Sequence, residues 1–334
     1  MDVKPKFRPN PELKLLDQVK QVLRYHHYSI RTEQAYVLWI TRFVKFFHCK
    51  KHPKDMGKKE IEQFLSYLVI KQNIAAATQR QAFNAILFLY RDVLNIDMDE
   101  SIEPVKSKRQ KHPPVVLTKN EVKMIFNQMS GKHLLMTKLL YGSGLRLMEC
   151  VRLRVQNLDF ERDIIYIRAA KGGKDRTTLL PNYIKQDLQE QVAKAKILHE
   201  NDLSLGYGEV YLPNALAQKY KNAAKEFHWQ YVFPGMNLTN DPRTGIVRRH
   251  HVLESGLQKA VKTAVKRAGI SKRISCHTFR HSFATHLLED STNIRIVQEL
   301  MGHGDVKTTE IYTHVMAKDI RSVNSPLDNL NLRS

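Results

Sequence analysis

Apolar residues recur at helical spacing through the first 95 residues of the chain, in four blocks separated by short polar breaks. The blocks cover residues 11–27, 31–47, 58–72 and 77–94. Apolar positions three and four residues apart lie on one side of a helix, so each block predicts a helix with one buried face. Together they predict a four-helix domain over residues 1–97.

The helical pattern stops between residues 98 and 117, where three prolines and several basic residues replace it. Proline disfavours helix and like charges stay solvated, so this segment predicts an interdomain linker. Its cations are candidate contacts to DNA: Lys106, Lys108, Arg109 and Lys111. Thr118 and Glu121 then have the spacing of a capping box, which predicts the first helix of a second domain over residues 118–316.

Strand-like alternation appears twice within this second domain. Residues 163–181 alternate on both sides of a turn at 171–174, whose two glycines tolerate positive φ angles. Residues 244–253 predict a second hairpin. The remaining patterned segments predict helices at 182–200, 213–226, 255–268, 277–289, 293–301 and 305–316. We therefore expect a mainly α protein with small β-hairpins, an α+β fold.

The charge of the chain indicates its partner. Lys and Arg number 54 against 33 Asp and Glu, a net charge of +21 over 334 residues. Because these cations are spread along the whole length, a phosphate backbone explains them better than a membrane surface. The N-terminus has no apolar signal segment, and no stretch approaches the length of a membrane span. We expect a cytoplasmic protein that associates with the nucleoid in bacteria.

The cysteines and histidines offer an alternative use as metal ligands. The three cysteines are far apart and odd in number, which predicts buried, reduced thiols: Cys49, Cys150 and Cys276. A metal site would use the histidines that follow Cys276, namely His277, His281 and His286. However, Thr278 stands where a zincin motif needs glutamate, and Cys276 has no partner cysteine nearby. No metal and no other cofactor is expected.

Cleavage of a DNA strand without a metal needs a nucleophile, cations around the phosphate and an acid for the leaving oxygen. Arg146 follows a Gly-Ser-Gly break at the start of a helical pattern, where it can face an anion or remain a solvated charge. His277 and Arg280 are three residues apart and share a helix face, whereas Phe279 and Phe283 mark the buried face.

Tyr312 is the candidate nucleophile. A phenol has a pKa of about 10 and attacks poorly at neutral pH unless cations or a base assist. His303 stands between two glycines, which is compatible with an exposed turn that reaches the phosphate. On spacing alone Tyr312 is also compatible with an ordinary core aromatic.

Four segments of the second domain resemble the tyrosine recombinases, in their order and their internal spelling. They read GLRLMECVRLRVQNLDF, KGGKDRTTLLP, HTFRHSFATHLLE and LMGHGDVKTTEIYTHV. The resemblance implies that the scissile phosphate is held by Arg146, His277, Arg280 and His303. Lys171 would protonate the leaving 5′ oxygen, and Tyr312 would form a 3′-phosphotyrosine. Glu149 matches a supporting acidic position that orients a cation.

The same resemblance implies a homo-tetramer in the synaptic complex, with the tail at 317–334 docking on its own domain or on a neighbouring subunit. Residues 206–233 form a longer passage than compact recombinases have, and they resemble the additional helix of integron integrases. That likeness implies recombination of gene cassettes between a duplex integration site and cassette sites used as folded single strands.

Flat rings beside cations can stack on unpaired bases, which a regular duplex does not offer. The candidate DNA contacts in and after the insertion, and in the first hairpin, are Lys174, Trp229, Pro242, Arg248, Arg249, His250 and His251. The alternative is that Trp229 and Tyr231 belong to the core and that the basic hairpin only grips phosphates. Three other functions stay open at this point: a duplex-only Xer or phage-type recombinase, a type IB topoisomerase and a non-catalytic DNA-binding protein.

Overall fold

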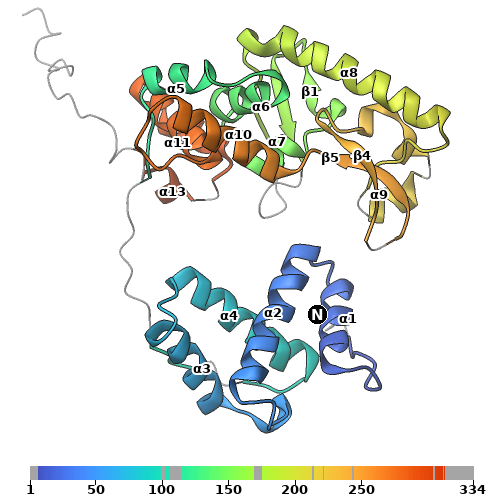
Figure 1. Cartoon of the computed structure of the whole chain (residues 1–334), viewed down its shortest axis with the longest axis vertical. Helices are drawn as coiled ribbons and strands as arrows, with labels where there is room; N and C mark the ends of the chain where they lie inside the picture. Colours follow the sequence, from blue (N-terminus) through green and yellow to red (C-terminus); the bar gives the residue numbers. More distant parts are fainter. Residues whose placement is uncertain are drawn as a thin grey trace, which may run out of the picture. The chain divides into compact units, whose positions relative to one another are not determined.

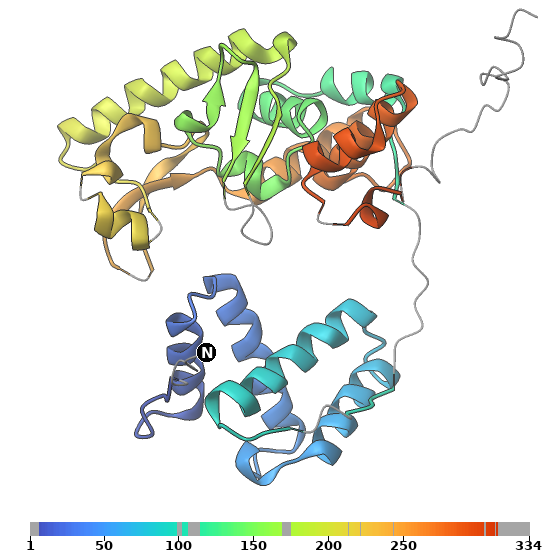
Figure 2. The same ribbon diagram turned by 180° about the vertical axis from the view of Figure 1, so that it is seen from behind.

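The computed structural model describes residues 7–98, 102–105, 114–168, 175–212, 214–220, 222–242, 244–303, 305–310 and 312. The chain divides into two compact units, Met1–Lys111 and His112–Ser334 (Figures 1 and 2). Helices alone build the described part of the first unit, whereas the second combines helices with two small sheets. None of the helices in these ranges has both the length and the apolar character needed to cross a bilayer.

Four helices make up the described part of the first unit, and their periodic apolar faces meet in its core. They are α1 (Leu15–Tyr25), α2 (Ile30–Phe46), α3 (Lys58–Ile70) and α4 (Ala76–Phe88), followed by a π-helical turn at Leu89–Val93. Phe43 on α2 packs edge-on against Phe64 on α3, with 5.5 Å between the ring centroids, and against Tyr90. Such pairs add to the stabilisation from apolar burial. The four predicted helices are confirmed.

Both described ends of the predicted linker pack on the unit beside them. Ile102 is buried in the first core, and the backbone oxygen of Val105 accepts a 2.7 Å hydrogen bond from Gln79. At the other end Leu117 is buried, and its backbone N–H donates to Ser282 Oγ at 2.9 Å. The four cations predicted to contact DNA between these ends lie outside the described residues.

Nine helices appear in the described part of the second unit. They are α5 (Lys119–Phe126), α6 (Gly131–Gly142), α7 (Leu147–Val151), α8 (Lys185–Ser204), α9 (Asn214–Lys219), α10 (Glu254–Arg267), α11 (Cys276–Glu289), α12 (Ile294–Met301) and α13 (Lys307–Glu310). The predicted capping box opens α5, because Thr118 Oγ1 accepts from the Glu121 N–H at 3.1 Å and Glu121 Oε2 accepts from the Thr118 N–H at 2.8 Å. One apolar core joins α5, α6, α7, α10 and α11 to the sheet.

Three antiparallel strands form the first sheet, in the order β1 (Leu158–Asp159), β2 (Ile164–Ile167) and β3 (Arg176–Leu179). The register pairs Ile164 with Leu179 and Ile167 with Arg176, which confirms the predicted pair of strands. Strand β1 was not predicted, because two residues are too few to show alternation. The turn between β2 and β3, with Lys171 and Lys174, lies outside the described residues.

The second hairpin differs from its prediction. Strand β5 (Val247–His251) falls within 244–253, but its partner β4 (Pro234–Asn240) precedes that range. Strand β4 begins with Pro-Gly and is polar and mostly open to solvent, so its sequence shows no apolar alternation. Backbone pairing with β5 sets its conformation instead.

Two further predictions need correction. The helix expected at 213–226 is limited to α9, and a 3₁₀ turn at Ala223–Lys225 follows it. Ala223 is buried with Tyr231 in a small cluster, so local packing overrides helix propensity there. Cys49 is exposed at a positive φ of 56° just after α2, whereas Cys150 and Cys276 are buried as predicted.

Candidate active site

Helix α11 carries two of the predicted phosphate ligands on one face. The helix begins after Ser275, whose backbone N–H donates to Thr278 Oγ1 at 3.0 Å. Phe279 and Phe283 are buried in the core, as their spacing predicts. His277 is exposed beside them, whereas Arg280 is only 4% exposed. The imidazole therefore faces solvent from the rim of the site and the guanidinium lies at its floor.

Arg280 is fixed by backbone oxygens from two distant segments. Its terminal nitrogens donate to the oxygens of Gly144 and Met301. Burial lowers the pKa of Arg280 to about 9, and repulsion from Arg146 acts in the same direction, so the group remains a cation at neutral pH. Gly144 allows this approach, because it has a φ of +60° and a Cβ there would lie 2.4 Å from Phe283.

Arg146 lies immediately before α7 and is held by the carboxylate one turn later. Its Nη1 donates to Glu149 Oε1 at 2.8 Å, and its backbone N–H donates to Glu149 Oε2 at 2.8 Å. The remaining terminal nitrogen donates to the Gly302 oxygen at 3.2 Å. Glu149 thus orients this guanidinium, which is the role that the family resemblance implies for it.

A third arginine, Arg176 on β3, completes the cluster and was not singled out from the sequence. It forms a bidentate ion pair with Glu149, at 2.9 and 2.7 Å, and its Nε donates to the Leu300 oxygen at 3.0 Å. Its side chain is 7% exposed. Gly302 has a φ of +59°, and a Cβ there would lie 2.5 Å from Arg176 Cδ. One feature of the sequence could have identified Arg176. It lies two residues before Thr178 on the same strand, so its side chain shares the inward face with that buried residue.

Glu149 is a strongly acidic carboxyl in this arrangement. Burial by itself raises its pKa, but the hydrogen bonds and charge of Arg176, together with those of Arg146, lower the pKa to about 2. The carboxylate is therefore charged throughout the neutral range and serves as the counter-ion between the two guanidiniums.

His303 follows Gly302 and points into the same site. Its Nδ1 lies 2.9 Å from Oγ1 of Thr309, a residue that is fully buried. Burial lowers the pKa of His303 to about 4, assisted by Arg280, Arg146 and Arg176, so the ring is neutral at pH 7. The pKa of His277 is also lowered, because its exposed ring is partly covered at the edge of the cluster and lies near Arg280 and Arg146.

Tyr312 is both a core aromatic and a neighbour of the cations. It is 2% exposed and packs against α11 and α12, with the cluster Phe283, Ala284, Leu288, Val297 and Met301. The His303 ring is stacked on it at 6.2 Å between centroids. Burial raises the pKa of the phenol, whereas Arg280 and Arg146 oppose that rise. The phenol is also hydrogen-bonded to His281, which the sequence had suggested only as a metal ligand.

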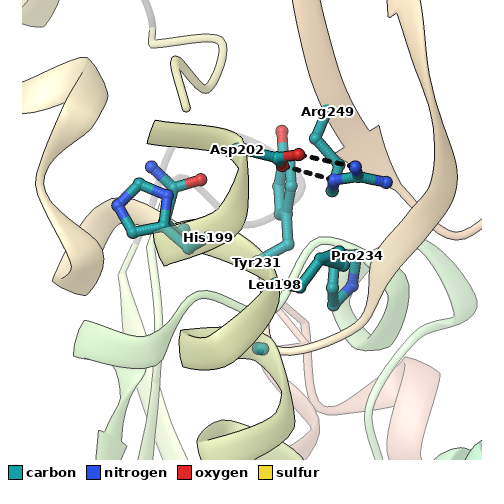
Figure 3. Close-up of a pocket in the computed structure, with 8 residues that line it drawn as sticks. Leu198, His199, Asp202, Tyr231, Pro234 and Arg249 are labelled. Atoms are coloured by element: carbon teal, nitrogen blue, oxygen red, sulfur yellow. Dashed lines mark hydrogen bonds and ion pairs between the residues drawn. The ribbon is translucent and has the colours of Figure 1, made fainter. Parts of the chain in front are cut away.

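The other predicted DNA contacts among the described residues lie around the β4–β5 hairpin, and two of them, Arg248 and Arg249, form ion pairs within the fold. Arg249 forms a bidentate ion pair with Asp202 of α8, at 2.5 and 2.7 Å, beside a small polar cavity (Figure 3). It also donates to the backbone oxygens of Gly235 and Met236. Arg248 pairs with Asp241 at 3.1 Å. These contacts attach β5 to α8 and to β4.

The remaining ring candidates divide between surface and core. His250 is exposed and stacks on buried Tyr231 with 5.7 Å between centroids, whereas His251 is 7% exposed and its Nδ1 lies 2.8 Å from the Val252 oxygen. Trp229 is half-buried beside Tyr231 in a small apolar cluster. Pro242 is exposed at the turn of the hairpin. These residues lie on or near β4 and β5, whereas the arginines and histidines around Tyr312 lie on or next to α7, α11 and α12. The two groups are therefore distinct.

The stability that is lost when the Glu149 charge is removed should depend on pH in a defined way. The folded pKa of about 2 is below the ordinary value of 4.5. The group therefore stabilises the fold above about pH 4.5 and loses this contribution as the pH falls toward 2. We expect Glu149→Gln to lower the free energy of unfolding at neutral pH by up to about 3 kcal/mol. In urea titrations at several pH values, this deficit should shrink in acid.

Glu161→Gln provides the matched control, because Glu161 is an exposed carboxyl in the turn between β1 and β2. It should change stability little at any pH. A deficit for Glu149→Gln that stays constant down to acid pH would show that shape, and not charge, accounts for the role of this residue.

Comparison with known proteins shows the family of this chain. Residues 115–319 match the phage integrase family, and residues 15–100 match the phage integrase N-terminal SAM-like domain. An integrase/recombinase of Escherichia coli is 44% identical over 322 residues, covering 96% of this chain and 95% of that protein. The tyrosine recombinase XerC of Lacticaseibacillus casei is 27% identical over 310 residues, covering 88% of this chain and 91% of that protein.

The fold also matches a solved structure, the XerH site-specific recombinase bound to a palindromic difH substrate in a post-cleavage complex. The TM-score is 0.60 at 20% identity, and the match covers 92% of this chain and 83% of that one. The mainly α architecture with small sheets is therefore the one expected from the motifs. The chain belongs to the phage integrase family of tyrosine recombinases and is a site-specific DNA recombinase.

Proposed function

We propose that this recombinase cleaves and rejoins DNA through a 3′-phosphotyrosine formed on Tyr312. The observation that carries the proposal is the position of Arg146, Arg280 and His303 beside Tyr312. The two arginines donate to the backbone oxygens of Gly302 and Met301, just before His303, and both lie close enough to the phenol to oppose the rise in its pKa. The His303 ring stacks on that of Tyr312. Two cations and a neutral imidazole in a partly buried site provide hydrogen-bond donors where charge develops on a phosphoryl group.

In the proposed reaction the Tyr312 oxygen attacks phosphorus and displaces the 5′ oxygen of the next nucleotide. Arg146 and Arg280 would neutralise the charge on the non-bridging oxygens, and His277 and His303 would donate hydrogen bonds to them. Glu149 and Arg176 would keep Arg146 in place. Lys171 would donate a proton to the departing oxygen. Because the phosphotyrosine conserves the energy of the broken bond, a 5′ hydroxyl from another strand can reverse the attack, and no ATP is required.

The nucleophile is tested by Tyr312→Phe, which removes one oxygen and keeps the ring. We expect the variant to bind its duplex site as the wild type does and to lose the covalent protein–DNA adduct that a denaturing gel detects. Tyr183→Phe is the control, because Tyr183 is 84% exposed and should be dispensable for adduct formation. An adduct that persists in Tyr312→Phe would refute the assignment.

The acid is tested by Lys171→Ala on two substrates. Cleavage of ordinary DNA should fall by roughly 10²–10⁴-fold, the usual contribution of a general acid. With sulfur in place of the bridging 5′ oxygen, the rate should return close to that of the wild type, because a thiolate leaves without protonation. An equally slow variant on both substrates would argue against the acid role of Lys171.

We further propose that the recombinase is of the integron type and moves gene cassettes between duplex integration sites and folded single-stranded cassette sites. The β4–β5 hairpin supports this, because Arg249 fixes its base to α8 while His250 stays exposed on Tyr231. A rigid hairpin with an exposed flat ring can stack on an unpaired base. Residues 206–233 would complete that surface with Trp229.

The other units take roles within the same proposal. Residues 1–97 would bind the core site as one arm of a clamp, joined by the basic linker at 98–117. Four subunits would assemble on two sites, with the tail at 317–334 docking on its own unit or on a neighbour.

Arg152 is a further candidate DNA contact, because it is exposed and lies near His250. Burial lowers the pKa of His250, and the charge of Arg152 lowers it further.

The integron type is tested by comparing a folded cassette-site hairpin with a duplex of the same sequence in which every base is paired. Wild-type protein should bind and recombine the hairpin, and His250→Ala should weaken hairpin binding by roughly 1–3 kcal/mol, the usual contribution of one stacked base. Its binding to the duplex should stay unchanged. Activity on the duplex alone would instead favour an Xer-type recombinase, and relaxation of any supercoiled plasmid would favour a topoisomerase.

A further inference from the structure

The phenol of Tyr312 has a hydrogen-bond partner that the reaction scheme above does not use. His281 Nδ1 lies 2.9 Å from the Tyr312 oxygen, and the two ring centroids are 5.6 Å apart. His281 follows Arg280 on α11 and is one helical turn beyond His277. It therefore borders the phosphate ligands while it faces the nucleophile.

We propose that His281 is a positioning residue that holds Tyr312 in a covered resting state, and that this hydrogen bond must break before Tyr312 can attack a phosphate. The inference rests on the proposed role of Tyr312 as nucleophile. In this role His281 does not contact the DNA. It stabilises the covered position of Tyr312 relative to the position from which Tyr312 attacks.

Access is the first argument. A phosphodiester in the site must come within bonding reach of the phenol oxygen, with the reacting atoms about 3–3.5 Å apart. Tyr312 is only 2% exposed, and its ring is packed in the cluster that joins α11 to α12. The described position therefore gives no approach to a group as large as a phosphate, so Tyr312 must move relative to α11.

The donor and acceptor roles are the second argument. Burial lowers the pKa of His281 to about 4, with further contributions from His277 and Arg280, so the imidazole is neutral and Nδ1 can accept. Burial also raises the pKa of Tyr312, so the phenol keeps its proton and donates. This pairing stabilises the protonated, unreactive form of the nucleophile.

Of the two histidine rings beside Tyr312, His281 is the one that is hydrogen-bonded to the phenol. His303 stacks on Tyr312, but its Nδ1 is directed to Thr309 at 2.9 Å. Among the described residues, the Tyr312 oxygen is hydrogen-bonded to His281. Loss of this one acceptor should therefore free the phenol without disturbing the phosphate ligand beside it.

The test is a pair of substitutions of equal size, His281→Leu and His281→Asn, in the full chain. Leu removes the acceptor, whereas the Asn amide oxygen lies near the former Nδ1. The readout is nitration of Tyr312 by tetranitromethane, followed by mass spectrometry of its peptide. We expect Leu to increase the nitration rate on the order of two- to ten-fold, the effect of one hydrogen bond, and Asn to restore the wild-type rate. Tyr183 is the internal control.

Single-turnover cleavage distinguishes storage from chemistry. If His281 only stores the nucleophile, His281→Leu should cleave at least as fast as the wild type. Unchanged nitration of Tyr312, or slower cleavage despite faster nitration, would overturn the proposal. The nitration result does not depend on whether Tyr312 is the nucleophile. Nitration measures the accessibility of the Tyr312 phenol, whether or not this residue attacks DNA.

Thermal melting and duplex binding would verify that both variants are folded. If His281→Leu does not fold, nitrogen-15 NMR of the wild type provides the second measurement. The Nδ1 resonance of His281 should shift in Tyr312→Phe, which lacks the donor and conserves the ring. An unshifted resonance would likewise overturn the proposal.

Discussion

The carboxylate of Glu149 is the constraint on which the rest of the site depends. Three guanidiniums, those of Arg146, Arg176 and Arg280, approach one another in a partly buried space, and like charges repel strongly there. Glu149 pairs with two of them and also accepts from the backbone at the start of α7. One anion thus orients two cations and leaves a surplus of positive charge, which is the condition for binding a phosphate.

The elements whose signal is local could be predicted from the sequence, and those that depend on distant neighbours could not. The N-terminal helices and the start of α5 follow from periodicity and the Thr118 capping box. Strand β4 has no apolar alternation, so its pairing partner alone defines it. Family motifs indicated Arg146 and Tyr312, but the pairing of Arg176 with Glu149 arises only when β3 meets α7.

The basic residues at 248–251 illustrate how the fold determines which side chains of a charged segment reach the surface. Four consecutive cationic or titratable side chains follow Val247 on one strand, and the sequence makes all four candidate DNA contacts. In the structure Arg249 is bound to Asp202, His251 is buried and His250 is exposed. Alternation along a strand sends neighbours to opposite faces, so charge density in a sequence does not measure charge on a surface.

The arginines of the site are held to a large extent by the main chain. Arg280 donates to the oxygens of Gly144 and Met301, Arg146 to that of Gly302, and Arg176 to that of Leu300. Every residue type supplies a carbonyl oxygen, so these acceptors do not depend on a particular side chain, although Gly144 and Gly302 are required for their backbone conformation. The geometry of the arginine cluster therefore depends more on the path of the backbone through these segments than on the side chains they carry.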